Sequence, residues 1–247
     1  MENFPIIKML KRIVTLLEII RIHTKEQRVM KKYILLLLAL LLAIGTLGCS
    51  KAAETKAFPA EFADAQSVVA YLKQQNEIYV QTGKNSGDLS KSKREDTTEN
   101  GQHPYAVIVT CSDSRVPAEH IFNAGIGELF VIRTAGNVIG DHALGSVEYG
   151  MEHLGAKLVV VLGHTNCGAV DAALNGGAHG AIATITDEIS GCLIPECDPR
   201  ESEILNVENS ISRIMDSHII AEITQTGTSR VVGAIYDIES GTVEFFE

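Results

Sequence analysis

Short, continuous apolar runs in the second half of the chain predict buried strands. Three runs are rich in β-branched residues and show no alternation of apolar and polar positions: 105–110, 128–133 and 157–163. Runs of this kind are typical of strands covered on both faces, as in a parallel sheet. Between the last two runs, 141–155 spaces its apolar residues three and four apart, which predicts a helix. This order predicts an α/β domain with a central, mostly parallel sheet flanked by helices.

The segments around these runs complete the predicted domain. Apolar residues at helical spacing predict a helix over 60–80 and a second one near 204–225. The last part, 230–246, has two strand-like runs around a Glu-Ser-Gly turn. In contrast, 82–103 contains no apolar run and many turn-forming residues, so we expect a long surface loop there.

The N-terminal part has a different pattern, which indicates export. Lys31 and Lys32 precede an apolar run at 33–44. The run is shorter than the roughly 20 residues of a membrane-spanning helix but suits the core of a signal peptide. Cys49 follows Gly48 in a stretch similar to the bacterial lipoprotein signal. We therefore expect lipidation of this cysteine and anchoring at the cell surface or the periplasmic side of the cytoplasmic membrane; a plain signal peptide or an uncleaved anchor is the alternative.

These features divide the chain into four parts. We expect a signal peptide at 30–49, a polar tether at 50–59 and the folded domain at 60–247. The part before them, 1–29, is either an upstream extension or a mis-assigned start. A signal peptide begins near its own basic residues, which favours a start at Met30. The apolar residues of 1–29 share one helical face, which favours a genuine amphipathic extension.

The charge distribution narrows the class of partner. Residues 1–49 hold 8 of the 21 Lys and Arg residues and 3 of the 31 Asp and Glu residues, so the remainder holds 13 basic and 28 acidic residues, a net charge of −15. An acidic body without a basic stripe repels phosphate backbones, which argues against nucleic acid as a partner. A small neutral or weakly charged substrate is easier to accept.

Side chains that bind metals follow two of the predicted strands. Cys111 comes directly after 105–110, and His164 and Cys167 follow 157–163. The carboxyl ends of adjacent parallel strands lie side by side, so we expect these three side chains to meet. Two thiolates and one imidazole suit zinc. Three protein ligands leave a fourth position open, as in a catalytic rather than a structural zinc site.

Asp113 and Arg115 occupy the same loop as Cys111. Asp113 is near enough to be a fourth ligand, which would close the site, unless Arg115 holds its carboxylate in a bidentate ion pair. A closed site would favour a non-catalytic zinc protein that serves as an interaction module. An open site favours an enzyme. Each residue alone is more often structural, and only the joined pattern points to a metal site.

The joined motifs, Cys-x-Asp-x-Arg and His-x-x-Cys, resemble those of the β-class carbonic anhydrases. The resemblance runs from about residue 64 to 247 and includes 71–83, 111–137, 145–170 and 231–246. It implies that zinc is held by Cys111, His164 and Cys167, with a dyad of Asp113 and Arg115, in a homodimer or homotetramer. The implied reaction is the reversible hydration of carbon dioxide to bicarbonate and a proton, through attack by a zinc-bound hydroxide. A related alternative keeps the scaffold but hydrolyses carbon disulfide or carbonyl sulfide.

The resemblance also implies residues that contact the substrate. Gln102, nine residues before Cys111, matches the glutamine of the always-open type and would donate a hydrogen bond to the substrate oxygen. Phe130 and Tyr149 match apolar pocket positions, with Tyr149 reaching in from the partner subunit. Gly168 matches the glycine whose backbone N–H faces the substrate. The bicarbonate-inhibited type has a tryptophan where this chain has Ile108, although Arg133 and Tyr149 match the other two residues of its inhibitory site. The absence of the tryptophan favours a non-allosteric site.

The stretch 176–203 departs from the family's pattern. Larger relatives carry more helix there, and we expect a short, irregular segment. It contains Cys192 and Cys197. In an exported protein these form either a disulfide or two free thiols.

Overall fold

The computed structural model describes residues 11, 12, 14–16, 18, 21, 28, 30, 32, 62–194 and 196–246. The predicted signal segment, Cys49 and the tether lie outside these residues. The described positions between 11 and 32 are helical. Within the described part of the chain, no helix combines the length and the apolar character needed to cross a membrane.

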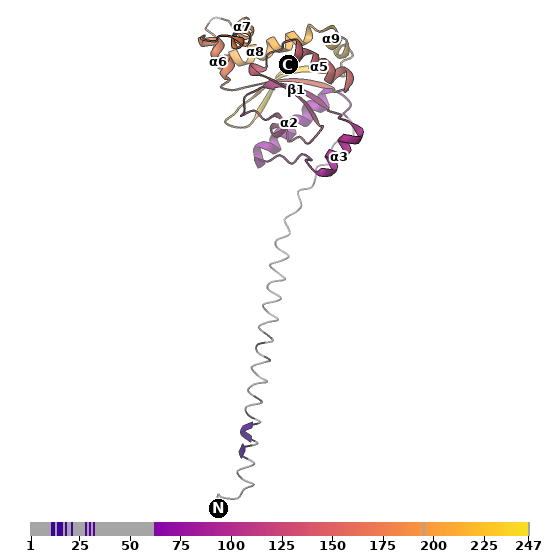
Figure 1. Cartoon of the computed structure of the whole chain (residues 1–247), viewed down its shortest axis with the longest axis vertical. Coiled ribbons are helices and arrows are strands. Elements are labelled where there is room, and N and C mark those ends of the chain that lie inside the picture. The colour runs from indigo at the N-terminus through magenta and orange to yellow at the C-terminus, as the bar shows by residue number, and fades with distance from the viewer. Residues whose placement is uncertain are drawn as a thin grey trace, which may run out of the picture. The chain divides into compact units, whose positions relative to one another are not determined.

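A five-stranded sheet forms the centre of the domain (Figure 1). The strands are β1 (Ala106–Cys111), β2 (Leu129–Thr134), β3 (Leu158–His164), β4 (Arg230–Tyr236) and β5 (Val243–Phe246). They lie in the order β2-β1-β3-β4-β5, and all neighbours pair in parallel except β4 and β5. Every residue of β1 and β3 is buried, which explains their continuous apolar runs. The predicted α/β class with a mostly parallel sheet is confirmed.

Helices cover both faces of this sheet. The helices within residues 62–246 are α2 (Ala65–Thr82), α3 (Lys91–Asn100), α4 (Ala118–Ile121), α5 (Asp141–Glu148), α6 (Gly168–Asn175), α7 (Ala181–Ser190), α8 (Pro199–Met215) and α9 (His218–Gln225), with a 3₁₀ turn at Ala135–Asn137 and a π-helical turn at Tyr149–His153. One core lies between the sheet and α2 and α4, and another lies between the sheet and α5, α8 and α9. Figure 1 shows the resulting layers, with α2 below the sheet and α5, α8 and α9 above it.

The prediction of a long surface loop over 82–103 is wrong in part, because α3 lies within this segment. Ser90 caps this helix by accepting the N–H of Lys93 at 3.1 Å, and Lys91 pairs with Glu95 at 2.9 Å. Caps and pairs of residues three or four apart stabilise a helix locally. No residue of α3 is buried. Its sequence therefore has no apolar periodicity, and the pattern could not indicate a helix.

Two further expectations need correction in the C-terminal half. The stretch 176–203 is not irregular throughout, because it contains α7, whose Ile189 is fully buried. The single helix expected near 204–225 is two helices, α8 and α9. The first ends at Met215 with Asp216 as its C-cap, and Ser217 caps the second by accepting the N–H of Ile220 at 3.3 Å. A serine at this position competes with a continuous helix.

The cysteines of the segment between α7 and α8 do not form a disulfide. Cys192 and Cys197 are both free thiols. The Sγ of Cys192 lies 3.0 Å from the carbonyl oxygen of Ile189 and donates to it. Of the two alternatives for this pair, the structure has the free thiols.

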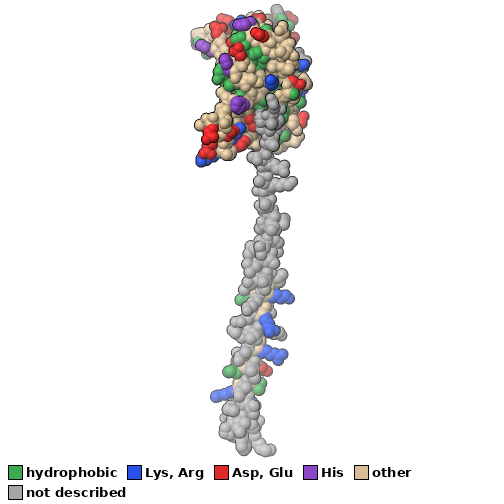
Figure 2. Space-filling view, turned by 90° about the vertical axis from the view of Figure 1, so that its right-hand side faces the viewer, with side chains coloured by type: hydrophobic (Ala, Val, Ile, Leu, Met, Phe, Trp, Pro, Cys, Tyr) green, Lys and Arg blue, Asp and Glu red, His purple; other side chains and the backbone are tan. Residues whose placement is uncertain are grey.

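The surface of the domain carries mixed charge. On the face of the domain that Figure 2 shows, Lys and Arg side chains are scattered among acidic ones, and no basic stripe crosses the described residues within 62–246 there. The longest run of charged side chains is α3, whose lysines pair with acidic neighbours. This face offers no extended positive surface to a polyanion.

Candidate metal centre

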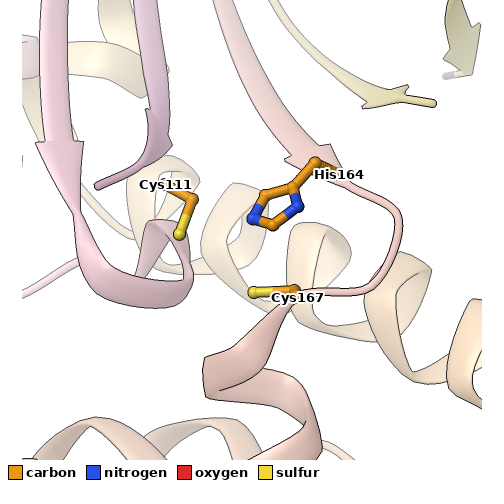
Figure 3. A group of neighbouring side chains, drawn as sticks. All are labelled: Cys111, His164 and Cys167. Carbon is orange, nitrogen blue, oxygen red and sulfur yellow. The ribbon is translucent and has the colours of Figure 1, made fainter. Parts of the chain in front are cut away.

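Three side chains with metal-binding atoms converge at the carboxyl ends of two neighbouring strands (Figure 3). Cys111 ends β1, His164 ends β3, and Cys167 precedes the first residue of α6. Their ligand atoms all lie within 4.8 Å of one another, and all three residues are buried. Among the described residues, no other group of His, Cys, Asp and Glu side chains is arranged in this way.

A tight turn after β3 brings Cys167 back toward the strand. Asn166 has a φ of 55°, the left-handed conformation that asparagine tolerates better than most residues. Thr165 fixes the start of the turn, since its N–H donates to the carbonyl of Tyr236 at 3.0 Å and its Oγ1 accepts the N–H of Ile238 at 3.0 Å. The turn is therefore attached to β4 and the residues that follow it.

The thiol of Cys111 lies among hydrogen-bond donors. Its Sγ accepts the backbone N–H of Asp113 at 3.4 Å and that of Gly136 at 3.3 Å. The hydrogen bond shared with Cys167 is the main cause that lowers the pKa of Cys111 to about 4; His164 and the two amides contribute to the same shift, and burial opposes it. The same shared bond raises the pKa of Cys167. Without a metal the pair thus holds one thiolate and one proton, and a cation that displaces the proton meets two sulfur ligands.

The imidazole of His164 is oriented by one nitrogen, and its other nitrogen is available to a metal. Its Nδ1 lies 2.9 Å from the carbonyl oxygen of Thr165, the kind of contact that orients a ligand histidine. Its Nε2 is buried and meets no hydrogen-bond partner in the described part of the chain. A buried nitrogen without a partner is costly, and a metal bound there would remove that cost. Two thiols and this nitrogen fit zinc.

Asp113 and Arg115 form a bidentate ion pair beside the three ligands. Arg115 donates from Nε to Oδ1 at 3.0 Å and from Nη2 to Oδ2 at 2.7 Å. These hydrogen bonds lower the pKa of Asp113 to about 2. The Oδ2 atom still lies 4.0 Å from Nε2 of His164. Asp113 could either be held by Arg115 or act as a fourth ligand. In the structure Arg115 holds its carboxylate next to the cluster.

Two residues outside the predicted motifs hold the loops of the site. Arg133, on β2, donates from Nε to the carbonyl of Cys111 at 3.2 Å and from Nη2 to that of Asp113 at 2.6 Å. Glu203, on α8, accepts the N–H of Cys167 at 3.4 Å. An arginine inside an otherwise apolar strand was a signal for the first. The second comes from a distant helix and left no signal in the spacing of the motifs.

The predicted substrate-binding residues fall into two groups. Gly168 begins α6 next to Cys167, and the space around its α-carbon is open. Gln102, Phe130 and Tyr149 lie at the other end of the sheet. Gln102 precedes β1, and Phe130 pairs with the second residue of that strand, about 13 Å from its last residue. The ring of Tyr149 lies 6.1 Å from that of Phe130. A single chain does not bring these three side chains to the cluster.

Comparison with known proteins agrees with this geometry. A family model described as carbonic anhydrase matches residues 106–243. Carbonic anhydrase 2 of Mycobacterium tuberculosis is 40% identical over 152 residues, which cover 57% of this chain and 73% of that protein.

Solved structures of similar fold include the β-carbonic anhydrase CafA of Aspergillus fumigatus, at 26% identity and a TM-score of 0.54, covering 74% of this chain and 90% of that one. A chain from the structures of two tetrameric β-carbonic anhydrases of Sordaria macrospora is 23% identical, with a TM-score of 0.55. The match covers 72% of this chain and 96% of that one. The parallel sheet, the Cys-His-Cys cluster and the family match lead to one conclusion: the chain belongs to the carbonic anhydrase family and is a member of its zinc-dependent β class.

Proposed function

We propose that this protein catalyses the reversible hydration of carbon dioxide with a zinc ion held by Cys111, His164 and Cys167. The observation that carries the proposal is the convergence of these ligand atoms within 4.8 Å, next to a carboxylate that an arginine holds. When bound, zinc supplies a Lewis acid that lowers the pKa of a water molecule to about 7. Bicarbonate and a proton are the products.

The chain's own residues orient the reaction. Asp113 is ionised at neutral pH because Arg115 keeps its pKa near 2, so it accepts a hydrogen bond from the attacking water and directs its lone pair. Arg133 fixes the backbone carbonyl of Asp113, which limits movement of the acid. The N–H of Gly168 lies at the N-terminus of α6, and the dipole of a helix favours negative charge, such as that of bicarbonate, at this end.

We assign the remaining substrate-binding residues to a partner subunit in a homodimer or homotetramer. Gln102, Phe130 and Tyr149 lie at the amino end of the sheet, away from the ligands of the same chain. Tyr149 is 47% exposed although its ring is large and apolar. A second copy could place the amino end of its sheet against the carboxyl end of the sheet in this chain. It would then supply Gln102 and an apolar wall to the metal site. The tetrameric state named for the Sordaria enzymes supports such an assembly.

We also propose that the protein is exported and anchored by a lipid on Cys49. The support is the sequence alone: Lys31 and Lys32 before the apolar run at 33–44, with a lipoprotein-like end at Cys49. Expression in bacteria with labelled palmitate tests this. Label on the wild type that is lost from Cys49→Ser supports the anchor, and an unlabelled secreted wild type refutes it.

The activity is tested by stopped-flow hydration of carbon dioxide with the full chain, with bound zinc quantified, on both sides of neutral pH. Activity at pH 7 and above supports an open site. Activity confined to pH values above about 8 would mean that Asp113 binds the metal at lower pH. Absence of activity with a full complement of zinc would refute the proposal, and sulfide released from carbon disulfide would identify the hydrolase alternative.

A further inference from the structure

A single peptide group in the turn after β3 is held from both sides. The carbonyl oxygen of Asn166 and the N–H of Cys167 belong to this group, and in a trans peptide they point in opposite directions. The oxygen accepts Nη2 of Arg115 at 3.1 Å. The N–H donates to Oε1 of Glu203 at 3.4 Å. The peptide thus links a carboxylate on α8 to the arginine that holds Asp113.

Glu203 is placed to act through this peptide because its carboxylate is buried beside it. Burial raises the pKa of this carboxyl group, whereas the N–H of Cys167 and the nearby Arg200 favour its charged form. Glu203 is 5% exposed and lines a cavity of about 270 Å³ between α6 and α8. Nη1 of Arg200 lies 4.0 Å from its other oxygen, and Arg200 also bonds to Glu244 at 2.9 Å. The 3.4 Å hydrogen bond is long. A charged acceptor in a buried site nevertheless polarises the amide that donates to it.

The helix that carries Glu203 is fixed to both cysteine loops. Asn206, one turn further along α8, donates from Nδ2 to the carbonyl of Gly136 at 2.7 Å, and the N–H of Gly136 donates to Sγ of Cys111. Residues three apart share a helix face. The face of α8 that carries Glu203 and Asn206 therefore supports the loops of both predicted cysteine ligands.

We propose that Glu203 is a positioning residue for the dyad of Asp113 and Arg115, acting through the peptide group of Asn166 and Cys167. Its negative charge at the N–H strengthens the carbonyl as an acceptor for Arg115, and Arg115 then holds Asp113 in its bidentate geometry. Glu203 contacts neither the substrate nor Asp113. The role rests on the proposed function, because it concerns the orientation of the acid in that reaction.

Three variants of α8 separate positioning from simple support. Glu203→Gln keeps an acceptor atom but removes the charge, and Glu203→Ala removes both. Glu208→Ala is the matched control, since Glu208 is an exposed glutamate of the same helix. Zinc content and thermal unfolding of each variant report whether the site is still assembled. We expect Glu203→Gln and Glu208→Ala to bind one zinc per chain, as the wild type does.

The direct readout is the ¹⁵N NMR signal of the Nε–H of Arg115 in the zinc-loaded protein. We expect this proton to exchange with water at least about 10-fold faster in Glu203→Gln and Glu203→Ala than in the wild type and Glu208→Ala, because its guanidinium is held less firmly. Unchanged exchange in both Glu203 variants would overturn the proposal. This measurement does not depend on activity, so it decides the role of Glu203 even if the wild type hydrates no carbon dioxide.

A second readout tests whether the effect passes through Arg115. We expect Glu203→Gln to lower kcat about 2- to 5-fold with KM unchanged, because Asp113 is oriented less well. In an Arg115→Ala background the same change should add nothing, since the link is already broken. An equal fold-loss of kcat in both backgrounds would show that Glu203 acts by another route and would overturn the proposal.

Discussion

The ion pair of Asp113 and Arg115 is built for orientation more than for stability. Arg115 is half exposed, with 50% of its side chain accessible, and surface ion pairs contribute little to the free energy of unfolding. The geometry is nevertheless specific. Two parallel hydrogen bonds fix the carboxylate plane, and a third bond fixes the guanidinium on the turn of Asn166. Loss of either partner should therefore affect turnover far more than folding.

Substitution of the dyad tests this separation. We expect Asp113→Asn and Arg115→Ala to lower kcat by about 100-fold or more while zinc remains bound, because the acid's role in orienting the reacting water is lost. Stopped-flow kinetics and metal analysis of the same samples measure both quantities. Cys111→Ser is the contrasting variant and should lose zinc. Wild-type turnover in both dyad variants would refute the roles assigned to them.

The low pKa of Asp113 has a consequence for pH dependence. Its pKa of about 2 lies below the ordinary value, so the ionised form and its stabilising ion pair are present above about pH 4 and are lost only as the pH falls through 2. We expect the ¹³Cγ shift of Asp113 to stay constant from pH 9 to pH 5. In Arg115→Gln the titration midpoint should move up toward 4. A wild-type midpoint above 5 would contradict the assigned ion pair.

At the scale of elements, prediction succeeded where burial shapes the sequence. β1 and β3 are buried along their whole length, so their apolar runs and their order predicted the sheet, and the residues that follow them predicted the cluster. The helix α3 is stabilised by a cap and surface ion pairs, which leave no periodic signal. Arg133 and Glu203 reach the site from other elements, and only the packing of the folded chain shows which carbonyl or amide each contacts.

The packing of α8 against β3 depends on a residue without a side chain. A Cβ added to Gly163 would lie 2.6 Å from Cγ2 of Val207 and 2.8 Å from Cδ1 of Ile235. Contacts this short require the helix or its neighbours to move. Because α8 also carries Glu203 and Asn206, a movement here reaches the turn of Cys167 as well.

We therefore expect Gly163→Ala to lower the free energy of unfolding by about 1–3 kcal/mol, as overpacking of a core does. Thermal unfolding measured by circular dichroism provides the test. Gly145→Ala is the matched control, because its Cβ would meet no atom within 4 Å and the residue lies in α5, where alanine is the better helix former. An unchanged melting temperature for Gly163→Ala would show that α8 is not tightly packed at this point.

At the scale of the whole molecule, the two groups of predicted site residues lie at opposite ends of one sheet. The metal ligands and the dyad follow the carboxyl ends of β1 and β3, whereas Phe130 lies near the amino end of β2 with the ring of Tyr149 against it. No rotation of side chains spans about 13 Å of strand. A complete site of the proposed kind therefore requires two copies of the chain, each supplying one end.

Mixing two inactive variants tests this assembly. Cys111→Ser disables the metal end and Gln102→Ala the other, so each homodimer should be impaired. In a heterodimer the Gln102→Ala chain keeps its zinc ligands and receives Gln102 of the partner subunit, which restores one of its two sites. Random re-association of equal amounts should give about a quarter of the wild-type activity. A mixture of Cys111→Ser and Asp113→Asn, both altered at the same end, should recover nothing, because every site then lacks one of the two residues or the other. Equal activity of the two mixtures would mean that each chain builds its site alone.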